Sequence, residues 1–208
     1  MSSLTSGRDS AYATRMVAER IRYITQAWLV IVLALFFGAA LAGVQSALQP
    51  RIEQNRLNDT LGQIPRLVEG AREGRAQDMD GEVLYEALDA DGRRIGWVRP
   101  ASGGGFADRI EVLIGLDLPG RTITGLHVLD QKETPGLGNR ITEADWLDQF
   151  RNRPVRPRLE VVKGEPERDH EIQAITGATI SSESVVDTVN KAVRKSLPHP
   201  DNEVSHEP

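Results

Sequence analysis

The sequence predicts an α+β protein, with one long apolar helix near the N-terminus and a domain of helices packed on an antiparallel sheet. Three observations lead to this prediction. Residues 27–48 are nearly all apolar, strand-like runs flank short turn sequences between residues 82 and 130, and apolar residues recur at helical spacing near the C-terminus. Strands joined by tight turns pair antiparallel, and amphipathic helices bury their apolar face on such a sheet.

The apolar stretch AWLVIVLALFFGAALAGVQSAL, residues 27–48, predicts a single transmembrane helix. No Asp, Glu, Lys or Arg occurs between Tyr23 and Pro50. A helix of this length extends for roughly 33 Å, and the hydrocarbon layer of a membrane is about 30 Å thick. The alternative is a cleaved signal peptide with an Ala-Leu-Ala cleavage site at residues 40–42. Both this apolar run and the preceding segment, residues 1–26, are longer than is usual for such peptides.

Composition excludes several classes of function. The formal net charge is −5, and no region carries a dense basic stripe, which argues against a nucleic-acid partner. The absence of cysteine excludes disulfides, thiolate metal sites and iron–sulfur clusters. His127 has no second ligand residue at metal-binding spacing, so no metal site is predicted. No GxSxG motif is present, and no residue is predicted to be catalytic.

The remainder of the chain divides into a spacer, a domain and a tail. Residues 49–81 predict a juxtamembrane helical spacer of one or two short helices, interrupted by Gly62 and Pro65. The folded domain is expected at residues 82–197. The polar residues 198–208 predict a disordered tail.

Two hairpins are predicted in the first half of the domain. The runs at residues 82–90 and 93–101 flank an Asp-Gly pair, and those at residues 109–117 and 121–130 flank Leu-Pro-Gly. The glycine-rich segment SGGGFAD, residues 102–108, joins them. It lacks the Gly-Lys-Ser/Thr ending of a phosphate-binding loop, so a flexible turn is the preferred interpretation.

Three further elements are predicted toward the C-terminus. Residues 141–152 predict a short helix, because two aromatic residues lie one helical turn apart. Residues 158–164 predict a strand. A last amphipathic helix is expected to begin at a cap formed by Ser181 or Ser182.

Two short motifs are candidates for a binding site. ETPGLG, residues 133–138, places a proline and two glycines directly after a strand, which indicates an unusual backbone path suited to a planar ligand. A tight surface loop explains the same residues equally well. TGAT, residues 176–179, places small residues and free hydroxyl groups just before the last helix. The amides and dipole at a helix N-terminus favour an anionic phosphate on Thr179, and a plain helix cap is the alternative.

Together these features resemble a known family. A single N-terminal span, GFADRIEVLIGLD, ETPGLG and TGATISS before a final helix are similar to the G subunit of Rnf-type electron transport complexes, over about residues 82–195. The C subunit of the sodium-translocating NADH:quinone oxidoreductase shares this plan. The resemblance implies that residues 82–197 are an FMN-binding domain, and that a separate flavin transferase joins the phosphate of FMN to Thr179 as a phosphodiester. The other cofactor-binding residues that it implies are Thr176, Gly177, Ala178, Glu133, Thr134, Pro135, Gly136, Leu137 and Gly138.

The resemblance also implies a role and a location. It implies an electron-carrier subunit of a membrane complex that couples ferredoxin and NAD redox chemistry to ion translocation, with the other subunits as partners. The chain would cross the inner (cytoplasmic) membrane once, with residues 1–26 in the cytoplasm and the flavin domain in the periplasm. One departure is Gln173, where the family commonly has an aspartate. The alternatives are a membrane-anchored scaffold or binding domain without flavin, and the quinone-reductase C-subunit relative.

Overall fold

The computed structural model describes residues 6–79 and 81–195, and it describes side chains from Trp28 onward. The tail expected at residues 198–208 lies outside the described residues. The chain divides into two compact units, with the boundary between Asn55 and Arg56.

The first unit is made of the helix α1, which spans Ser6–Leu67 and continues into the second unit. Its large apolar side chains at residues 28–48 are exposed; that of Phe36, for example, is 66% exposed. Among the described residues, α1 is the one helix that is long and apolar enough to cross a membrane. The predicted N-terminal apolar helix is therefore confirmed.

The interruptions expected at Gly62 and Pro65 are wrong, because α1 passes both residues and ends at Leu67. A proline inside a helix costs about 3 kcal/mol. Ile64 and Leu67 lie on either side of Pro65 and are 0% and 3% exposed. Burial of two such side chains contributes about 3–6 kcal/mol, which equals or exceeds the cost of the proline.

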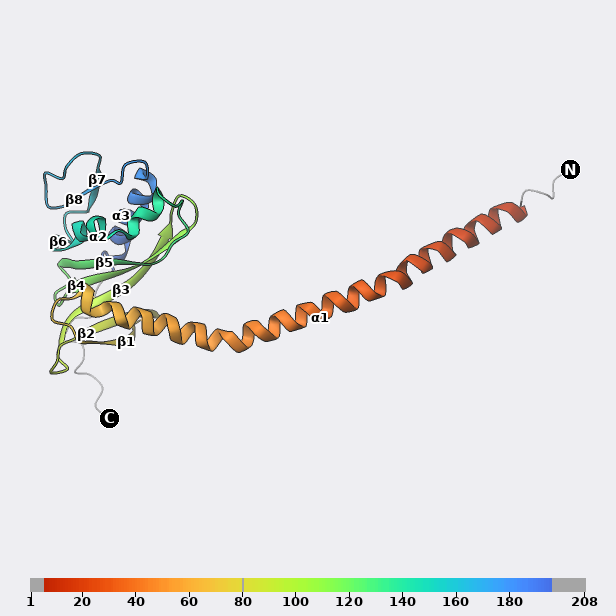
Figure 1. The fold of residues 1–208 in the computed structure, drawn as a ribbon, viewed down its shortest axis with the longest axis horizontal. Coiled ribbons are helices and arrows are strands. Elements are labelled where there is room, and N and C mark those ends of the chain that lie inside the picture. Colours follow the sequence, from red (N-terminus) through yellow and green to blue (C-terminus); the bar gives the residue numbers. More distant parts are fainter. Residues whose placement is uncertain (1–5, 80, 196–208) are drawn as a thin grey trace. The chain divides into compact units, whose positions relative to one another are not determined.

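The second unit contains a six-stranded antiparallel sheet in which the strands follow their order in the sequence (Figure 1). Both predicted hairpins are confirmed, as β2–β3 and β4–β5. The strands are β1 (Glu73–Met79), β2 (Glu82–Leu88), β3 (Arg94–Gly104), β4 (Arg109–Asp117), β5 (Thr122–Asp130) and β6 (Arg153–Pro154).

The sequence does not predict β1, which lies inside the segment expected to be a helical spacer. Its sequence, EGRAQDM, shows no alternation of apolar and polar residues. It pairs with β2 along its whole length, from Glu73 opposite Leu88 to Met79 opposite Glu82. Tertiary pairing, and not local preference, therefore makes this segment a strand.

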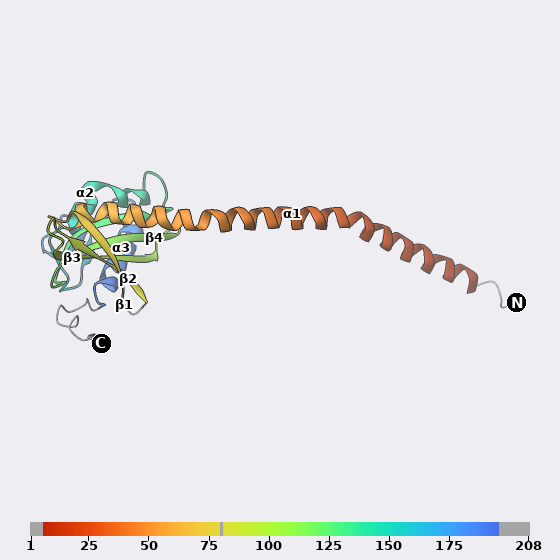
Figure 2. The same ribbon diagram turned by 90° about the horizontal axis from the view of Figure 1, so that it is seen from below.

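Helices cover both faces of the sheet in the second unit. Trp97 of β3 belongs to the apolar cluster that includes α3 (Thr179–Ala192), whereas the adjacent Val98 belongs to the cluster of Ile64 and Leu67. Successive side chains of a strand point to opposite faces. The last turns of α1 and the helix α3 therefore lie on opposite faces of the sheet (Figure 2).

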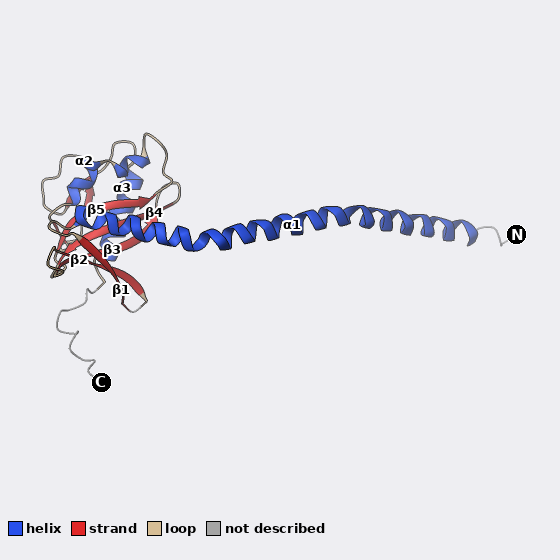
Figure 3. Cartoon of the chain, turned by 60° about the horizontal axis from the view of Figure 1, so that its bottom comes forward, coloured by secondary structure: helices blue, strands red, loops and turns tan. Residues whose placement is uncertain are grey.

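Between β5 and α3 the chain forms short elements (Figure 3). The helix expected at residues 141–152 is broken into α2 (Ala144–Leu147) and two 3-10 turns, Gly138–Thr142 and Asp148–Phe150. The strand expected at residues 158–164 is shorter than predicted, as β7 (Glu160–Val162), which pairs in parallel with β8 (Glu171–Gln173).

Candidate functional site

The two candidate motifs, distant in sequence, line one pocket of about 400 Å³. This volume lies within the range of small-molecule sites. The loop after β5 contributes one wall, the segment leading into α3 another, and the β3–β4 turn adds a phenylalanine. The lining residues are Phe106, Glu133, Thr134, Leu137, Gly138, Gly177, Ala178, Thr179, Ile180 and Ser181.

Thr179 is the first residue of α3, and Ala178 precedes it without a side-chain cap. The cap expected at Ser181 or Ser182 is therefore wrong. Both serines lie inside the first turn of the helix and are buried. The Ser182 hydroxyl accepts a hydrogen bond from the Ile175 amide and donates one to the Ala178 carbonyl, each at 3.0 Å. The Ser182 hydroxyl, from inside the first turn, thereby holds in place the segment that leads into α3.

The start of α3 provides groups that suit a phosphate. Among the described residues, the amides of residues 179–181 donate no hydrogen bond to a backbone carbonyl outside the helix. The first amide of this turn with a backbone partner is that of Ser182, which donates to the Ala178 carbonyl. Free amides and the positive end of the helix dipole attract anions. The Thr179 side chain is half-buried at the same end and lines the pocket. Its hydroxyl therefore lies where a phosphate would be stabilised.

Gly177 brings the two motifs into contact. It has a φ of +83°, a left-handed conformation that favours glycine. A Cβ there would lie 3.2 Å from Cδ2 of Leu137. Thr176 is exposed beside it and does not line the pocket, whereas Ala178 is buried.

The loop at residues 133–138 follows the unusual path that its composition indicates. The Thr134 carbonyl accepts hydrogen bonds from the amides of Leu137 and Asn139, both at 3.2 Å. Gly136 has a φ of +77°, and its amide donates to Asn139 Oδ1 at 2.7 Å. Pro135 is exposed and does not line the pocket. Four of the six loop residues, including its two ends, line the pocket, and two do not.

Glu133 is buried, and its carboxylate binds neighbouring parts of the protein. Its Oε1 accepts a hydrogen bond from the Ala107 amide at 3.0 Å, and its Oε2 accepts one from the Ser181 hydroxyl at 2.6 Å. A Cβ at Gly138 would lie 2.6 Å from Oε2, and one at Gly105 would overlap Oε1. The absence of a side chain at Gly105 and Gly138 therefore leaves the space that the Glu133 carboxylate occupies.

Three apolar side chains at the pocket are well exposed: Phe106 at 65%, Leu137 at 47% and Ile180 at 54%. Exposed apolar groups beside free helix amides fit a ligand that has both a planar ring and a phosphate. Sequence reasoning did not name Phe106, Ile180 or Ser181 as site residues. For Phe106 the sequence does carry a signal of a binding role, because a glycine-rich turn seldom needs a large apolar side chain.

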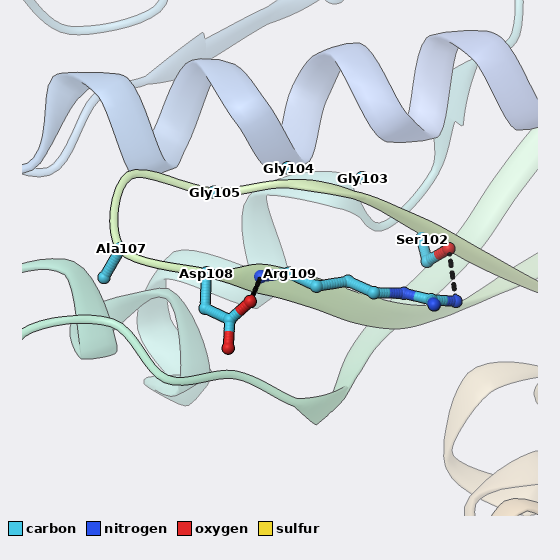
Figure 4. Close-up of a pocket in the computed structure, with 7 residues that line it drawn as sticks. All are labelled: Ser102, Gly103, Gly104, Gly105, Ala107, Asp108 and Arg109. Atoms are coloured by element: carbon cyan, nitrogen blue, oxygen red, sulfur yellow. Dashed lines mark hydrogen bonds between the residues drawn. The ribbon is translucent and has the colours of Figure 1, made fainter. Parts of the chain in front are cut away.

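The glycine-rich segment borders this pocket through Phe106 and also lines a second pocket of its own, between residues 102 and 109 (Figure 4). β3 extends into the segment as far as Gly104. Gly103 packs against the Thr188 side chain of α3, and the Gly105 amide donates to the Asp108 carbonyl at 2.7 Å. Arg109 Nη2 donates to Ser102 Oγ at 2.8 Å. The glycines therefore serve strand pairing and close helix packing.

Gln173, two residues before Ile175, is held through its backbone. Its amide donates to Gln149 Oε1 at 2.7 Å, and its carbonyl accepts a hydrogen bond from Trp146 Nε1 at 2.9 Å. These two hydrogen bonds to its backbone fix the strand that leads into the TGAT segment.

His127 lies on β5, away from the pocket. Burial, together with the charge of Arg66, lowers the pKa of its imidazole below the ordinary value. Within residues 28–79 and 81–195, no three His, Asp or Glu side chains are grouped as metal ligands.

Residues 105–194 match the FMN-binding domain family. The G subunit of the Na(+)-translocating ferredoxin:NAD(+) oxidoreductase complex of Acetobacterium woodii is 38% identical over 107 residues, which cover 50% of this chain and 51% of that protein. The C subunit of the Na(+)-translocating NADH-quinone reductase of Yersinia pestis is 32% identical over 100 residues, 45% of this chain and 38% of that protein. The crystal structure of Shewanella oneidensis NqrC gives a TM-score of 0.48 at 20% identity, covering 55% of this chain and 61% of that chain.

The chain spans about half the length of the first of these relatives. The region matched by the domain family contains the loop at residues 133–138, the segment at residues 176–179 and all of α3. Residues 105–194 thus match the FMN-binding domain family, and the chain is similar over about half of its length to G subunits of ion-translocating oxidoreductase complexes.

Proposed function

We propose that this chain is an electron-carrier subunit of an ion-translocating membrane complex and that it carries FMN covalently on Thr179. One observation carries the proposal. In a domain of the FMN-binding family, the TGAT and ETPGLG motifs meet at one pocket, at the uncapped start of α3.

The residues present fit this cofactor. The amides at the start of α3 would stabilise the phosphate, whereas Phe106, Leu137 and Ile180 offer apolar surface to the ring system. When bound, FMN supplies the uptake and release of electrons, and the protein positions it and tunes its electronics. Thr134, Gly138 and Gly177 line the same pocket and would approach the flavin closely.

The proposed linkage is a phosphodiester between the Thr179 oxygen and the phosphate of FMN, formed by a flavin transferase with net loss of one water. Thr176, Gly177 and Ala178 would complete the sequence that this transferase recognises. Thr176 and Ile180 are exposed and Thr179 is half-buried, so the segment is accessible for modification. The backbone of Gln173 is held by two hydrogen bonds, so the segment that leads to Thr179 is fixed in place although the family commonly has aspartate at this position.

The partners would be the other subunits of the complex, which couples electron transfer between ferredoxin and NAD to ion movement. The apolar helix α1 would anchor the chain in the inner membrane, with the flavin domain on the periplasmic side. Anchoring raises the effective concentration of the carrier beside its donors and acceptors. A C-subunit role in a quinone reductase is the second candidate, and the higher identity to the G subunit, 38% against 32%, favours the first.

The mass of the intact protein tests the linkage. Protein purified from its native host and then denatured should keep flavin absorbance, and its mass should exceed the sequence mass by that of FMN minus one water. Thr179→Ala should lose this increment, whereas Thr176→Ser, which keeps a hydroxyl at the first position of the motif, should keep it. Unmodified mass and no flavin absorbance in the wild type would leave the scaffold alternative. Retention of the increment by Thr179→Ala would refute the assignment of the site.

The proposed topology is tested with intact cells whose outer membrane has been made permeable. Protease added from outside should digest the chain beyond residue 50. A cytoplasmic protein serves as the control for an intact inner membrane. Protection of the domain would place it on the opposite side.

A further inference from the structure

A buried carboxylate forms part of the pocket wall. Glu133 is 4% exposed and lines the pocket. Glu133 itself belongs to the loop after β5. One of its oxygens binds the Ala107 amide in the β3–β4 turn, and the other binds the Ser181 hydroxyl in the first turn of α3. The side chain therefore connects three segments of the chain. The Ser181 partner lies 48 positions away in sequence and only two residues after Thr179.

The hydrogen bonds of this side chain are those of an ionised carboxylate. Both oxygens accept, one from an amide and one from a hydroxyl. Within residues 28–79 and 81–195, no Lys, Arg or His forms an ion pair with Glu133. The adjacent Lys132 points its ammonium group to Asp108 instead, at 3.2 Å. No described cation pairs with Glu133. Its negative charge is instead stabilised by the Ala107 amide and by the Ser181 hydroxyl at the start of α3.

We propose that the charge of Glu133 lowers the reduction potential of the flavin held at Thr179, while its two hydrogen bonds hold the walls of the pocket together. This inference rests on the proposed function, because it requires FMN in the pocket. Glu133 is then a tuning and positioning residue. The resemblance places it against the flavin, and the structure adds that both of its oxygens are engaged by the protein.

The direction of the effect follows from electrostatics. Two-electron reduction to the anionic reduced flavin takes up two electrons from the reductant and one proton from solvent, so the ring system gains one net negative charge, and a nearby buried negative charge disfavours that gain. Glu133 lines the pocket, and a separation of roughly 10 Å between its carboxylate and the flavin ring serves for an order-of-magnitude estimate. At an effective dielectric constant of about 20, one charge at that separation changes an equilibrium constant by about tenfold. For a two-electron couple, tenfold corresponds to about 30 mV.

The central test compares Glu133→Gln with the wild type. A glutamine amide can accept the hydrogen bond from Ala107 through its oxygen and donate one to Ser181 through its nitrogen. The substitution therefore removes the charge and keeps both contacts. The measurement is a reductive titration of the full-length flavinylated protein in detergent, with dithionite supplying the two electrons and a dye of known potential reporting the midpoint.

Two further variants separate charge from geometry. Ser181→Ala removes one hydrogen bond and keeps the charge. Glu165→Gln removes an exposed carboxylate in the loop between β7 and β8 and serves as the matched control for net charge. We expect Glu133→Gln to raise the midpoint potential by about 30 mV or more. The potential of Ser181→Ala should lie at or below that of the wild type, and the potential of Glu165→Gln should equal that of the wild type.

Each outcome decides between distinct claims. A wild type without flavin contradicts the proposed function, and the inference fails with it. A flavinylated Glu133→Gln variant with the potential of the wild type contradicts the inference alone. A rise in Ser181→Ala as large as that in Glu133→Gln would assign the effect to geometry, which also overturns the role of the charge. Glu133→Ala, which loses charge and contacts together, should in addition lower the melting temperature; equal stability would refute the role in holding the walls.

Discussion

The indole of Trp146 donates a 2.9 Å hydrogen bond to the backbone carbonyl of Gln173. Gln149, from the same short helical region, accepts the hydrogen bond of the Gln173 amide at 2.7 Å. The last residue of β8 is therefore held at both its amide and its carbonyl by side chains from the segment after β5. This attachment fixes the strand that leads into the TGAT segment.

Loss of either attachment should destabilise the domain. Gln149→Met keeps the size of the side chain and removes the acceptor, and Trp146→Phe removes the donor. Each should lower the free energy of unfolding by about 0.5–1.5 kcal/mol, measured by urea denaturation. The Trp146 variant should lose more, because the smaller ring leaves space in the core.

Gln173→Ala is the matched control, since it changes only the side chain and keeps both hydrogen bonds to the backbone. It should alter the free energy of unfolding by no more than about 0.5 kcal/mol. A loss as large as that of Gln149→Met would show that the side chain at position 173 holds the strand.

A second prediction concerns the close approach of α1 to the sheet within the second unit. A Cβ on Gly115 of β4 would lie 2.6 Å from the carbonyl oxygen of Leu67. Gly115→Ala should therefore cost about 1–3 kcal/mol, because a backbone atom cannot rotate out of the way. Gly104→Ala, in open space on β3, is the control and should be close to neutral. Equal melting temperatures for the two variants would contradict this packing.

A third prediction concerns the end of α3. The buried Arg99 side chain donates hydrogen bonds to the carbonyls of Ala192 at 2.7 Å and Lys195 at 2.8 Å. Arg99→Met keeps the aliphatic stem and removes these donors, so it should cost about 1.5–3 kcal/mol. Hydrogen exchange of the amides in the last turn of α3 should accelerate. Arg93→Met, at an exposed position, should leave that exchange unchanged.

The fourth prediction is a pH dependence of stability. The amide of Glu167 donates a hydrogen bond to the Glu171 carboxylate, and this bond, with help from Arg168, holds the pKa of that carboxyl below its ordinary value of 4.5. A group whose pKa is lower in the folded protein stabilises it above the unfolded pKa, and the contribution disappears as the pH falls through the folded value.

Glu171→Gln should therefore be less stable than the wild type at pH 7, and the difference should shrink as the pH falls below 4.5. Thermal unfolding across this range measures it. Glu160→Gln, at an exposed position on β7, is the control for the loss of one carboxylate. A constant difference between Glu171→Gln and the wild type at every pH would contradict the linkage.

The sequence determined the features that depend on neighbouring residues. The apolar run at residues 28–48 is helical because it is a long uninterrupted apolar stretch without proline, and the two hairpins form because turn residues separate alternating runs. The motifs at residues 133–138 and 176–179 adopt the tight backbone that their glycines require. Each of these outcomes rests on local sterics and periodicity.

Tertiary structure decided the features that depend on distant partners. β1 is a strand because β2 pairs with it, and α1 passes Pro65 because burial of Ile64 and Leu67 offsets the cost. Phe106 and Ile180 became part of the pocket only when the β3–β4 turn met the start of α3. Glu133 came to bridge them because folding placed Ala107 and Ser181 within reach of its two oxygens, and local sequence does not encode a contact across 48 positions.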